Sequence, residues 1–590
     1  MLSRRYIKLI LPLRLEWEPC YYLSGDVGTG QRVIVKFAGR RTVGVVSEVD
    51  ITPDIDPSRI QPVLQADTGL DPISAREIEL WRFVADYYLC TIGEVYKAAY
   101  PSQKTASEEI EVHRTQRKQA LESREEEIWR QRIARLHSRL DAKNADLGRK
   151  HGEAVRIRLE AQRDAIIVDL KEAERRLADL SHNLGIEAND FSALLARVPD
   201  LKAEPALLRA IQSGRPTLLK SADRNSDYIQ TAAQTLRAGK NVCILVNETA
   251  LASQLCDSLK ATFGELLLVH HSKMTAAERR RINGSIRSGR PYILIGTRSA
   301  IFLPHRDLGL IIVDNEESAF YKQSDTAPRY NARDCAVQLA RIHGCSIILG
   351  SVSPSLESIL NARNGRYTLL DRNPHGEQLQ RACRFTLIDI PAERRKNGML
   401  GPVSRKLIDA MRRSKSSALI RGFEKPEELE GLDADILTIP QAAKTDMGRY
   451  ELTAILNADA LFNPSDFRSD EHAFHYLERL RSVCPRLIVQ TRQAGHQVFG
   501  MQSAETLLEE RRQFSLPPYT RMVELRCSRP EELGRALSAA GFSPAVLPSS
   551  VRVSLARDKN LLEAKRKLRK TVEAFRSKFK ADVIVDVDPI

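Results

Sequence analysis

The sequence has few of the features that would assign a function at once. Its nine cysteines are scattered over 590 residues without a Cys-x-x-Cys pair, which argues against both a zinc site and a disulfide framework. No apolar run is long enough to span a membrane. The apolar stretch in residues 1–12 is short and is interrupted by Lys8. We therefore interpret it as a first strand rather than a signal peptide, and expect a cytoplasmic protein.

Acidic residues are outnumbered by basic ones. The chain has 76 Asp and Glu against 90 Lys and Arg, which gives a net charge of +14. Such a surplus favours a polyanionic partner such as DNA, because neutralising phosphates releases their counterions. A surplus that serves only solubility is the alternative.

The length exceeds what one hydrophobic core supports, so we expect several domains. Residues 1–106 are rich in β patterns, with a hairpin over 30–46 and then a helix over 75–88. Residues 107–200 are rich in Arg, Glu, Lys, Leu and Ala, and carry apolar residues in heptad register. That pattern predicts an antiparallel helical coiled-coil hairpin. A solvated arm and a protein-binding arm explain it equally well.

The rest of the chain has α/β patterns. Short apolar strands alternate with amphipathic helices over 201–382, which is typical of a nucleotide-binding parallel sheet. A shorter α/β region covers 383–500, and a small α/β domain with a basic helix over 559–580 and a strand over 581–585 covers 501–590. The strands expected in the first region span 242–246, 266–269, 292–296, 308–314 and 346–350.

Five short motifs follow one another within this first α/β region. Asp314-Asn315-Glu316-Glu317 ends an apolar strand, and the carboxyl end of such a strand is where these sheets hold Mg²⁺ and nucleotide. Alone, this could be an ordinary polar strand end. The other four are Gly296-Thr297-Arg298-Ser299-Ala300, Tyr321-Lys322-Gln323, Arg329-Tyr330-Asn331-Ala332-Arg333-Asp334 and Gly350-Ser351-Val352-Ser353-Pro354-Ser355-Leu356-Glu357-Ser358.

The order and spacing of these motifs resemble superfamily 2 helicase motifs as they occur in the primosomal protein N′ (PriA) family of replication restart, where they read GTRSA, DEEH, YKQ, RY-x-ARD and GSATPSLES. The resemblance covers most of the chain except about 107–200. It implies an α/β multidomain fold with two RecA-like helicase lobes, 201–382 and a truncated 383–500. An N-terminal β-rich DNA-binding domain (1–106) would precede them, and the C-terminal α/β domain (501–590) would follow.

The family's ATP site is the part that this sequence does not reproduce. A P-loop should fall near 218–225, but that segment has no glycine, and Arg224 and Asn225 stand where Lys and Thr are expected. Asn315 replaces the first Glu of DEEH, and an amide cannot act as a base. The family implies ATP and Mg²⁺, but these losses predict a pseudo-ATPase. We interpret Asp314 and Glu316 as a degenerate, inactive motif II.

Two further family features are missing or altered. The eight-cysteine zinc insert should follow Arg421-Gly422-Phe423 but is absent, so we expect no zinc and no other metal. The family's N-terminal domain captures a 3′ DNA end with a Phe-Asp-Tyr segment, whereas this chain has Pro19-Cys20-Tyr21-Tyr22. The 3′-end pocket of the family is therefore not reproduced residue by residue.

Two groups of residues are candidates for DNA contact. Aromatic side chains interleaved with cations suit single-stranded DNA; packing between lobes is an equal alternative. A basic helix suits a phosphate backbone, with a solvated face as its alternative. The first group is Arg298, Phe320, Tyr321, Lys322, Arg329, Tyr330 and Arg333, and the second is Lys565, Arg566, Lys567, Arg569 and Lys570.

These observations favour a non-catalytic DNA-binding protein of replication restart that binds forked or single-stranded DNA. It would recruit other replication-restart or replisome proteins and would have no membrane partner. An active ATP-dependent 3′–5′ DNA helicase is one alternative. A protein-interaction scaffold built around residues 107–186 is another.

Overall fold

The computed structural model describes residues 4–66, 68–101, 128–148, several positions between 156 and 173, and then 191–247, 254–372, 383–443, 445–463, 466–500 and 504–589. The chain separates into two compact units. One comprises residues 1–12, 17–73 and 100–191, and the other comprises 13–16, 74–99 and 192–590.

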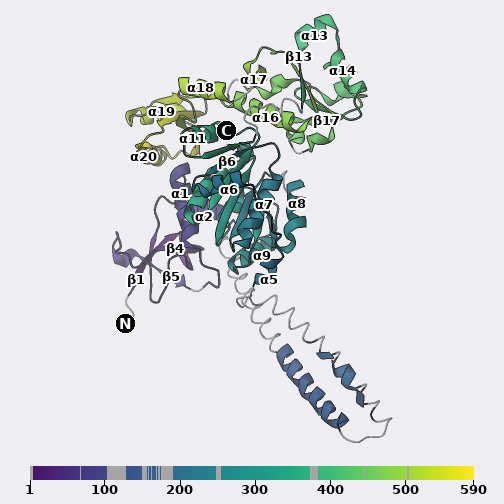
Figure 1. The fold of residues 1–590 in the computed structure, drawn as a ribbon. Coiled ribbons are helices and arrows are strands. Elements are labelled where there is room, and N and C mark those ends of the chain that lie inside the picture. Colours follow the sequence, from purple (N-terminus) through teal and green to yellow (C-terminus); the bar gives the residue numbers. More distant parts are fainter. Residues whose placement is uncertain are drawn as a thin grey trace. The chain divides into compact units, whose positions relative to one another are not determined.

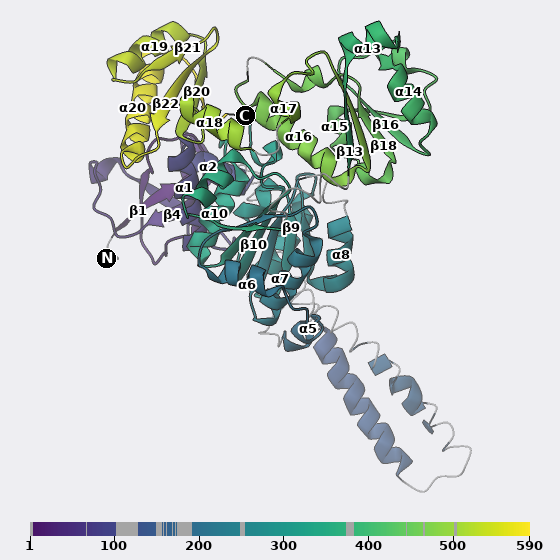
Figure 2. The same cartoon turned by 45° about the horizontal axis from the view of Figure 1, so that its top comes forward.

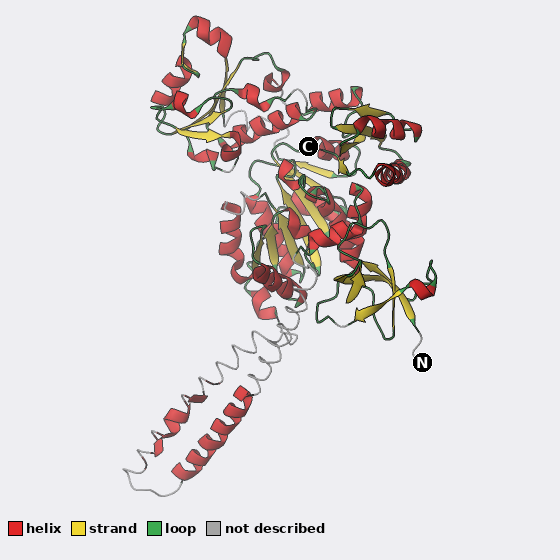
Figure 3. Ribbon diagram, turned by 180° about the vertical axis from the view of Figure 1, so that it is seen from behind, coloured by secondary structure: helices red, strands yellow, loops and turns green. Residues whose placement is uncertain are grey.

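The first unit contains a small closed β-barrel near the N-terminus (Figure 3). Valine and isoleucine side chains that alternate along β1, β3 and β4 are fully buried inside it, as period-2 patterns require. The antiparallel pair β3–β4 confirms the predicted hairpin. In barrel order the strands are β1 (Arg5–Ile10), β2 (Cys20–Leu23), β5 (Gln61–Gln65), β3 (Arg32–Phe37) and β4 (Arg40–Glu48).

Helical stretches of the same unit confirm part of the predicted coiled coil. Residues 128–147 are helical, and they lie beside the described helical residues between 156 and 173 (Figure 1). Leu136, Ile166, Leu170 and Ala173 are buried between them. These are heptad positions of the predicted pattern. Residues 107–127 and 174–190 of the predicted coiled-coil region lie outside the described residues, and its end holds the short helix α5 (Ser192–Ala196), which belongs to the second unit.

The second unit opens with two helices. Helix α1 (Ala75–Tyr88) has the bounds expected from the sequence, because Ser74 and Glu77 form a capping box at its start. Helix α2 (Ile92–Ala99) follows, and the rings of Trp81 and Tyr96 stack at 5.3 Å between centroids.

A seven-stranded parallel sheet forms the centre of the second unit, with helices on both faces (Figures 1 and 2). Its strands are near-continuous apolar runs because both faces are covered. The five predicted strands are confirmed to within two residues at their ends, and β6 and β12 are additional. The order is β12 (Thr368–Asp371), β6 (Thr217–Lys220), β11 (Ser346–Ser351), β10 (Leu308–Asp314), β7 (Asn241–Leu245), β9 (Ile293–Gly296) and β8 (Leu267–His270).

The helices that follow the strands of this sheet fix where the loops between strands and helices lie. Helix α7 (Asn225–Arg237) follows β6, and α8 (Gln254–Phe263) and α9 (Ala276–Arg287) come next. Helices α10 (Ala332–His343) and α11 (Leu356–Arg363) flank β11 in sequence. Since all seven strands are parallel, the loops that leave their carboxyl ends gather at one edge.

A second parallel sheet confirms the shorter α/β region. It is covered by α13 (Ile390–Lys396), α14 (Arg405–Arg412) and α16 (Ser469–Val483). Its strand order is β13 (Arg384–Asp389), β19 (Arg486–Thr491), β18 (Leu452–Ile455), β16 (Ser417–Arg421) and β17 (Asp435–Thr438).

The C-terminal part is a four-stranded antiparallel sheet against which α19 (Pro530–Ala539) and α20 (Leu561–Phe579) pack (Figure 2). Helix α20 is the predicted basic helix, and β23 begins two residues after the predicted start. The strand order is β21 (Pro544–Val546), β22 (Ser550–Ala556), β20 (Thr520–Cys527) and β23 (Val583–Val587). In the described part of the chain, no helix combines the length and apolarity needed to cross a membrane.

Candidate nucleotide and nucleic-acid site

The loop between β6 and α7 stands where a phosphate loop is expected. None of residues 218–225, all of which are described, has a positive φ, so the loop lacks the left-handed turns that glycine provides in a phosphate cradle. The backbone N–H of Ser221 donates to the carbonyl of Ser351 at 3.0 Å. This N–H is therefore tied to the end of β11 rather than presented to a ligand.

The guanidinium of Arg224 fills the space behind this loop. Arg224 is 8% exposed, and its Nη2 and Nε atoms lie 2.8 Å and 3.1 Å from Oδ1 of Asp314. Nη2 also donates to Oδ1 of Asn315 at 3.0 Å, and Nη1 donates to the carbonyl of Ser221. The cation that replaces the expected lysine thus points at the protein's own carboxylate.

Asp314 accepts hydrogen bonds on both oxygens. The Tyr228 hydroxyl donates to Oδ1 and the Asn315 amide donates to Oδ2, each at 3.0 Å. A Cβ at Gly350 would lie 1.7 Å from the Tyr228 hydroxyl oxygen, so the phenol occupies the space at the end of β11. These contacts do not fit Mg·ATP in the P-loop pose, in which this carboxylate faces the metal and the loop cradles the phosphates.

Burial and charge pairing set the protonation of this cluster. Burial disfavours the Arg224 cation, but the neighbouring Asp314 carboxylate outweighs it and raises the pKa of Arg224 above its ordinary value. Burial, and after it the same carboxylate, raise the pKa of the Tyr228 hydroxyl well above its ordinary value. The phenol therefore stays neutral and donates a hydrogen bond to Asp314.

Glu316 serves the start of helix α11. It is 1% exposed, and its Oε1 accepts the Ser355 N–H at 2.7 Å. Its Oε2 accepts the hydroxyls of Ser355 and Ser358, both at 2.9 Å, and Nη1 of Arg333 at 3.1 Å. Asn315 has φ of 50°, a left-handed conformation that asparagine tolerates. The predicted motif II residues are thus held apart: Asp314 pairs with Arg224, and Glu316 with α11 and Arg333.

Asn225 begins helix α7 and is partly exposed. Among the residues that the structure describes, no group of three or more His, Cys, Asp or Glu side chains is arranged to hold a metal ion.

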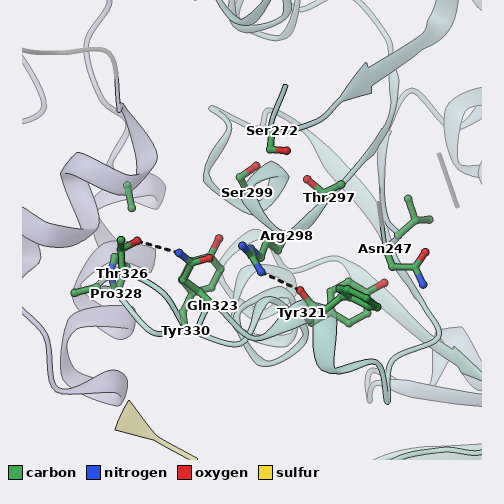
Figure 4. A pocket seen from close by; sticks show the side chains of 14 residues that line it. Asn247, Ser272, Thr297, Arg298, Ser299, Tyr321, Gln323, Thr326, Pro328 and Tyr330 are labelled. Carbon is green, nitrogen blue, oxygen red and sulfur yellow. Dashed lines mark hydrogen bonds between the residues drawn. The ribbon is translucent and has the colours of Figure 1, made fainter. Parts of the chain in front are cut away.

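A pocket of about 390 Å³, lined by both polar and apolar side chains, lies at the carboxyl ends of β7, β8 and β9. Figure 4 shows hydroxyl and amide side chains from several loops around it. Such groups can donate to phosphate oxygens, and the aromatic rings offer surfaces for bases. Its lining includes Asn247, Ser272, Thr297, Arg298, Ser299, Phe320, Tyr321, Gln323, Thr326 and Tyr330.

Two of the accessible predicted DNA-binding residues, Arg298 and Phe320, line this pocket, and a third, Arg329, lies between its lining residues Pro328 and Tyr330 in the sequence. Phe320 is 50% exposed. Nη1 of Arg298 donates to the carbonyls of Lys322 and Phe320 at 3.2 Å and 3.4 Å and so fixes the loop that carries Phe320. Arg329 is partly exposed, and its guanidinium donates to the carbonyls of Ser324 and Asp325.

The structure places four other members of the same group in the interior. Tyr321, Lys322, Tyr330 and Arg333 are each less than 9% exposed. The Tyr321 hydroxyl donates to the carbonyls of Leu245 and Asp314 at 3.0 Å and 2.5 Å. Lys322 Nζ lies 2.8 Å from an oxygen of Asp586. Lys322 and Arg333 therefore form ion pairs with carboxylates inside the protein. Internal packing explains these four residues better than DNA contact does.

The basic helix α20 also has some of its predicted DNA-binding cations in the interior or in ion pairs and others on the surface. Lys565 is 3% exposed, and its Nζ donates to the Tyr87 carbonyl at 2.8 Å. Burial lowers the pKa of Lys565 to about 8. Arg569 lies 2.6 Å from Glu16 and 2.9 Å from Glu573. Of the five predicted residues on this helix, Arg566, Lys567 and Lys570 are exposed and can meet phosphates.

Sequence reasoning missed the side chains that complete these clusters. Tyr228 lies four residues after Arg224 and so shares its side of the helix start, a spacing that could have indicated it. Ser355 and Ser358 lie inside a motif that was singled out, but nothing in their spacing names Glu316 as their partner.

Comparison with known proteins gives one family match and several curated relatives. The family model of the PriA 3'DNA-binding domain (3'BD) matches residues 8–101. The replication restart protein PriA of Haemophilus influenzae is 28% identical over 427 residues, 68% of this chain and 56% of that protein. PriA of Chlamydia pneumoniae is 38% identical over 170 residues, 29% of this chain and 23% of that protein.

PriA of Bacillus subtilis is 38% identical over 143 residues, 24% of this chain and 18% of that protein. The chain thus spans about half the length, or less, of the curated relatives it matches. Among solved structures, RecG bound to a three-way DNA junction matches with a TM-score of 0.32 and 16% identity, over 57% of this chain and 47% of that one.

Proposed function

Because the chain belongs to the PriA family of replication restart proteins, we propose that it binds forked or single-stranded DNA during restart without hydrolysing ATP. In this proposal the regions resembling helicase lobes, 201–382 and 383–500, serve as a DNA-binding scaffold. The N-terminal region that matches the 3'DNA-binding domain, residues 8–101, would contribute to DNA recognition.

The buried pair of Arg224 and Asp314 is the observation that carries the proposal. A Mg²⁺ ion at Asp314 would have to displace a guanidinium at 2.8 Å, a phenol and an amide. Leaving a buried ion without its partner costs about 3–5 kcal/mol. This cost is subtracted from the binding free energy of the nucleotide, so the affinity falls by about two to four powers of ten.

The pocket that Arg298 and Phe320 line supports DNA as the ligand. Hydroxyls and amides from the ends of β7, β8 and β9 line it, and the half-exposed ring of Phe320 lies at its edge. A phosphate backbone can be held by such donors while a base stacks on the ring, independently of sequence.

Binding of a labelled fork with a single-stranded arm tests the DNA contact by fluorescence anisotropy. Phe320→Ala should weaken binding by about 1–3 kcal/mol, the contribution of one stacked base, or roughly 5- to 150-fold. Phe514→Ala is the matched control, because this ring is 68% exposed and lies outside the pocket. Equal losses in both variants, or fork binding that does not weaken with salt, would refute this contact.

DNA-stimulated phosphate release tests the absence of hydrolysis. We expect release at the level of the blank, and Asp314→Ala should be indistinguishable from the unsubstituted protein. Turnover that depends on fork DNA and disappears in Asp314→Ala would instead support the active helicase.

A further inference from the structure

A strongly basic surface covers one side of the second parallel sheet. Residues 390–415 contain eight Lys and Arg but only two acidic residues, Glu393 and Asp409. This short segment therefore carries six of the fourteen net positive charges of the whole chain. Its two helices are α13 and α14, joined by a short hairpin of β14 (Met399–Leu400) and β15 (Val403–Ser404).

The two helices lie next to each other (Figures 1 and 2). Lys406 on α14 lies 3.5 Å from Glu393 on α13. A Cβ at Gly398, just after α13, would lie 3.5 Å from Nε of Arg405 at the start of α14. The cations of the two helices thus belong to one surface rather than to two.

The cations of this surface face outward. On α14, Leu407 and Ala410 are buried against the sheet, whereas Arg405 and Arg412 are exposed. We call the surface formed by six of these cations the basic face. They are Arg394, Arg395, Lys396, Arg405, Arg412 and Arg413, and all are exposed.

Acidic neighbours neutralise little of this charge. Among the described residues, the basic face has one acidic partner within 4 Å, Asp409, which lies 3.9 Å from Arg412. Exposed pairs at such distances contribute about 0–1 kcal/mol. The uncompensated cations therefore produce a local positive potential that attracts a polyanion.

From this arrangement we propose that the basic face binds the phosphate backbone of duplex DNA. Residues 390–415 contain no Phe, Tyr or Trp, so the surface offers no ring on which an unpaired base could stack. A contact made only by cations binds phosphates and does not depend on the base sequence of the DNA. The inference rests on DNA being the partner in the proposed function and adds a separate contact for a double-stranded arm.

The test uses the full chain and a blunt duplex of about 20 base pairs without single-stranded ends, titrated at several salt concentrations between about 50 and 200 mM. Arg394→Gln, Arg395→Gln and Arg413→Gln are combined in one variant, because none of the three has an acidic partner within 4 Å among the described residues. Each lost phosphate contact should lower the slope of log affinity against log salt by about 0.9.

Two matched variants separate a local contact from general charge. Arg209→Gln, Lys273→Gln and Arg281→Gln remove three exposed cations elsewhere in the same unit and should leave the slope nearly unchanged. Arg394→Lys, Arg395→Lys and Arg413→Lys keep the charge and should retain most of the affinity. All six positions are exposed, so circular dichroism melting should be unaltered.

The outcomes are distinguishable from those of the proposed function. Equal losses in the basic-face and control variants would show that only net charge matters and would overturn the inference. So would no duplex binding at about 50 mM salt, or a basic-face variant that loses binding to anionic lipid vesicles but not to duplex. Retained duplex binding with no Phe320-dependent fork binding would leave this contact standing and count against the proposed single-strand contact.

Discussion

At the scale of single residues, Arg224 stands where a phosphate-binding lysine is expected, but its positive charge is paired with Asp314 inside the protein. A guanidinium has several donors in a fixed plane, and here they reach Asp314, Asn315 and the carbonyl of Ser221 together. The sequence predicted that this loop could not cradle phosphate. It did not predict that the arginine would turn inward, because its partner lies 90 residues away.

A double-mutant cycle measures this pair. Arg224→Met or Asp314→Leu alone should lower the free energy of unfolding by about 3–5 kcal/mol, since each leaves one buried charge unpaired. The double variant should lose less than the sum of the two, because both charges are then gone. Chemical denaturation gives the three values, and strictly additive losses would mean that the two side chains do not form a pair.

The buried amine of Lys565 predicts a pH dependence. Its pKa is about 8 in the folded protein and 10.5 ordinarily, so the unfolded chain binds more protons between these values. Stability should therefore rise with pH across that window. Lys565→Met should remove this rise. Melting temperatures at about pH 7.5 and about pH 9.5 give the comparison, and an identical rise in both proteins would contradict it.

At the scale of elements, apolar runs and apolar periodicity could be recognised in the sequence, whereas partners distant in the chain could not. Apolar residues at helical spacing marked α1, and continuous apolar runs marked the parallel strands. The aromatic and cationic segment around Lys322 looked like a DNA surface because Asp586, its internal partner, lies 264 residues further on. For Lys565 a signal existed: with Leu568, Val572 and Phe575 it falls on the buried face of α20.

The start of helix α11 gives a prediction at the same scale. Glu316→Gln removes the charge that Arg333 faces at 3.1 Å and weakens the bonds to Ser355 and Ser358. Since Arg333 is buried, we expect a loss of about 3–5 kcal/mol in unfolding free energy. Asp334→Asn, which touches Arg333 but not α11, is the comparison. An unchanged melting temperature in Glu316→Gln would assign Glu316 a role outside folding.

At the scale of the whole molecule, the order of the motifs predicted an α/β protein of several domains, and the chain has two parallel sheets, an antiparallel sheet and a barrel. Sequence patterns could not predict which cations stay on the surface, because exposure depends on how the elements pack. Internal ion pairs hold Arg224, Lys322 and Arg333, so their charges do not face solvent. Other cations stay exposed, among them those of α13 and α14.

We propose that the first parallel sheet does not bind Mg·ATP, and isothermal titration calorimetry tests this most directly. Mg·ATP is titrated into the full chain, alone and saturated with fork DNA, up to about 1 mM, the upper end of ordinary substrate affinities. The account predicts no saturable heat in either case. Saturable binding of one nucleotide per chain that is lost in Asp314→Ala would contradict it.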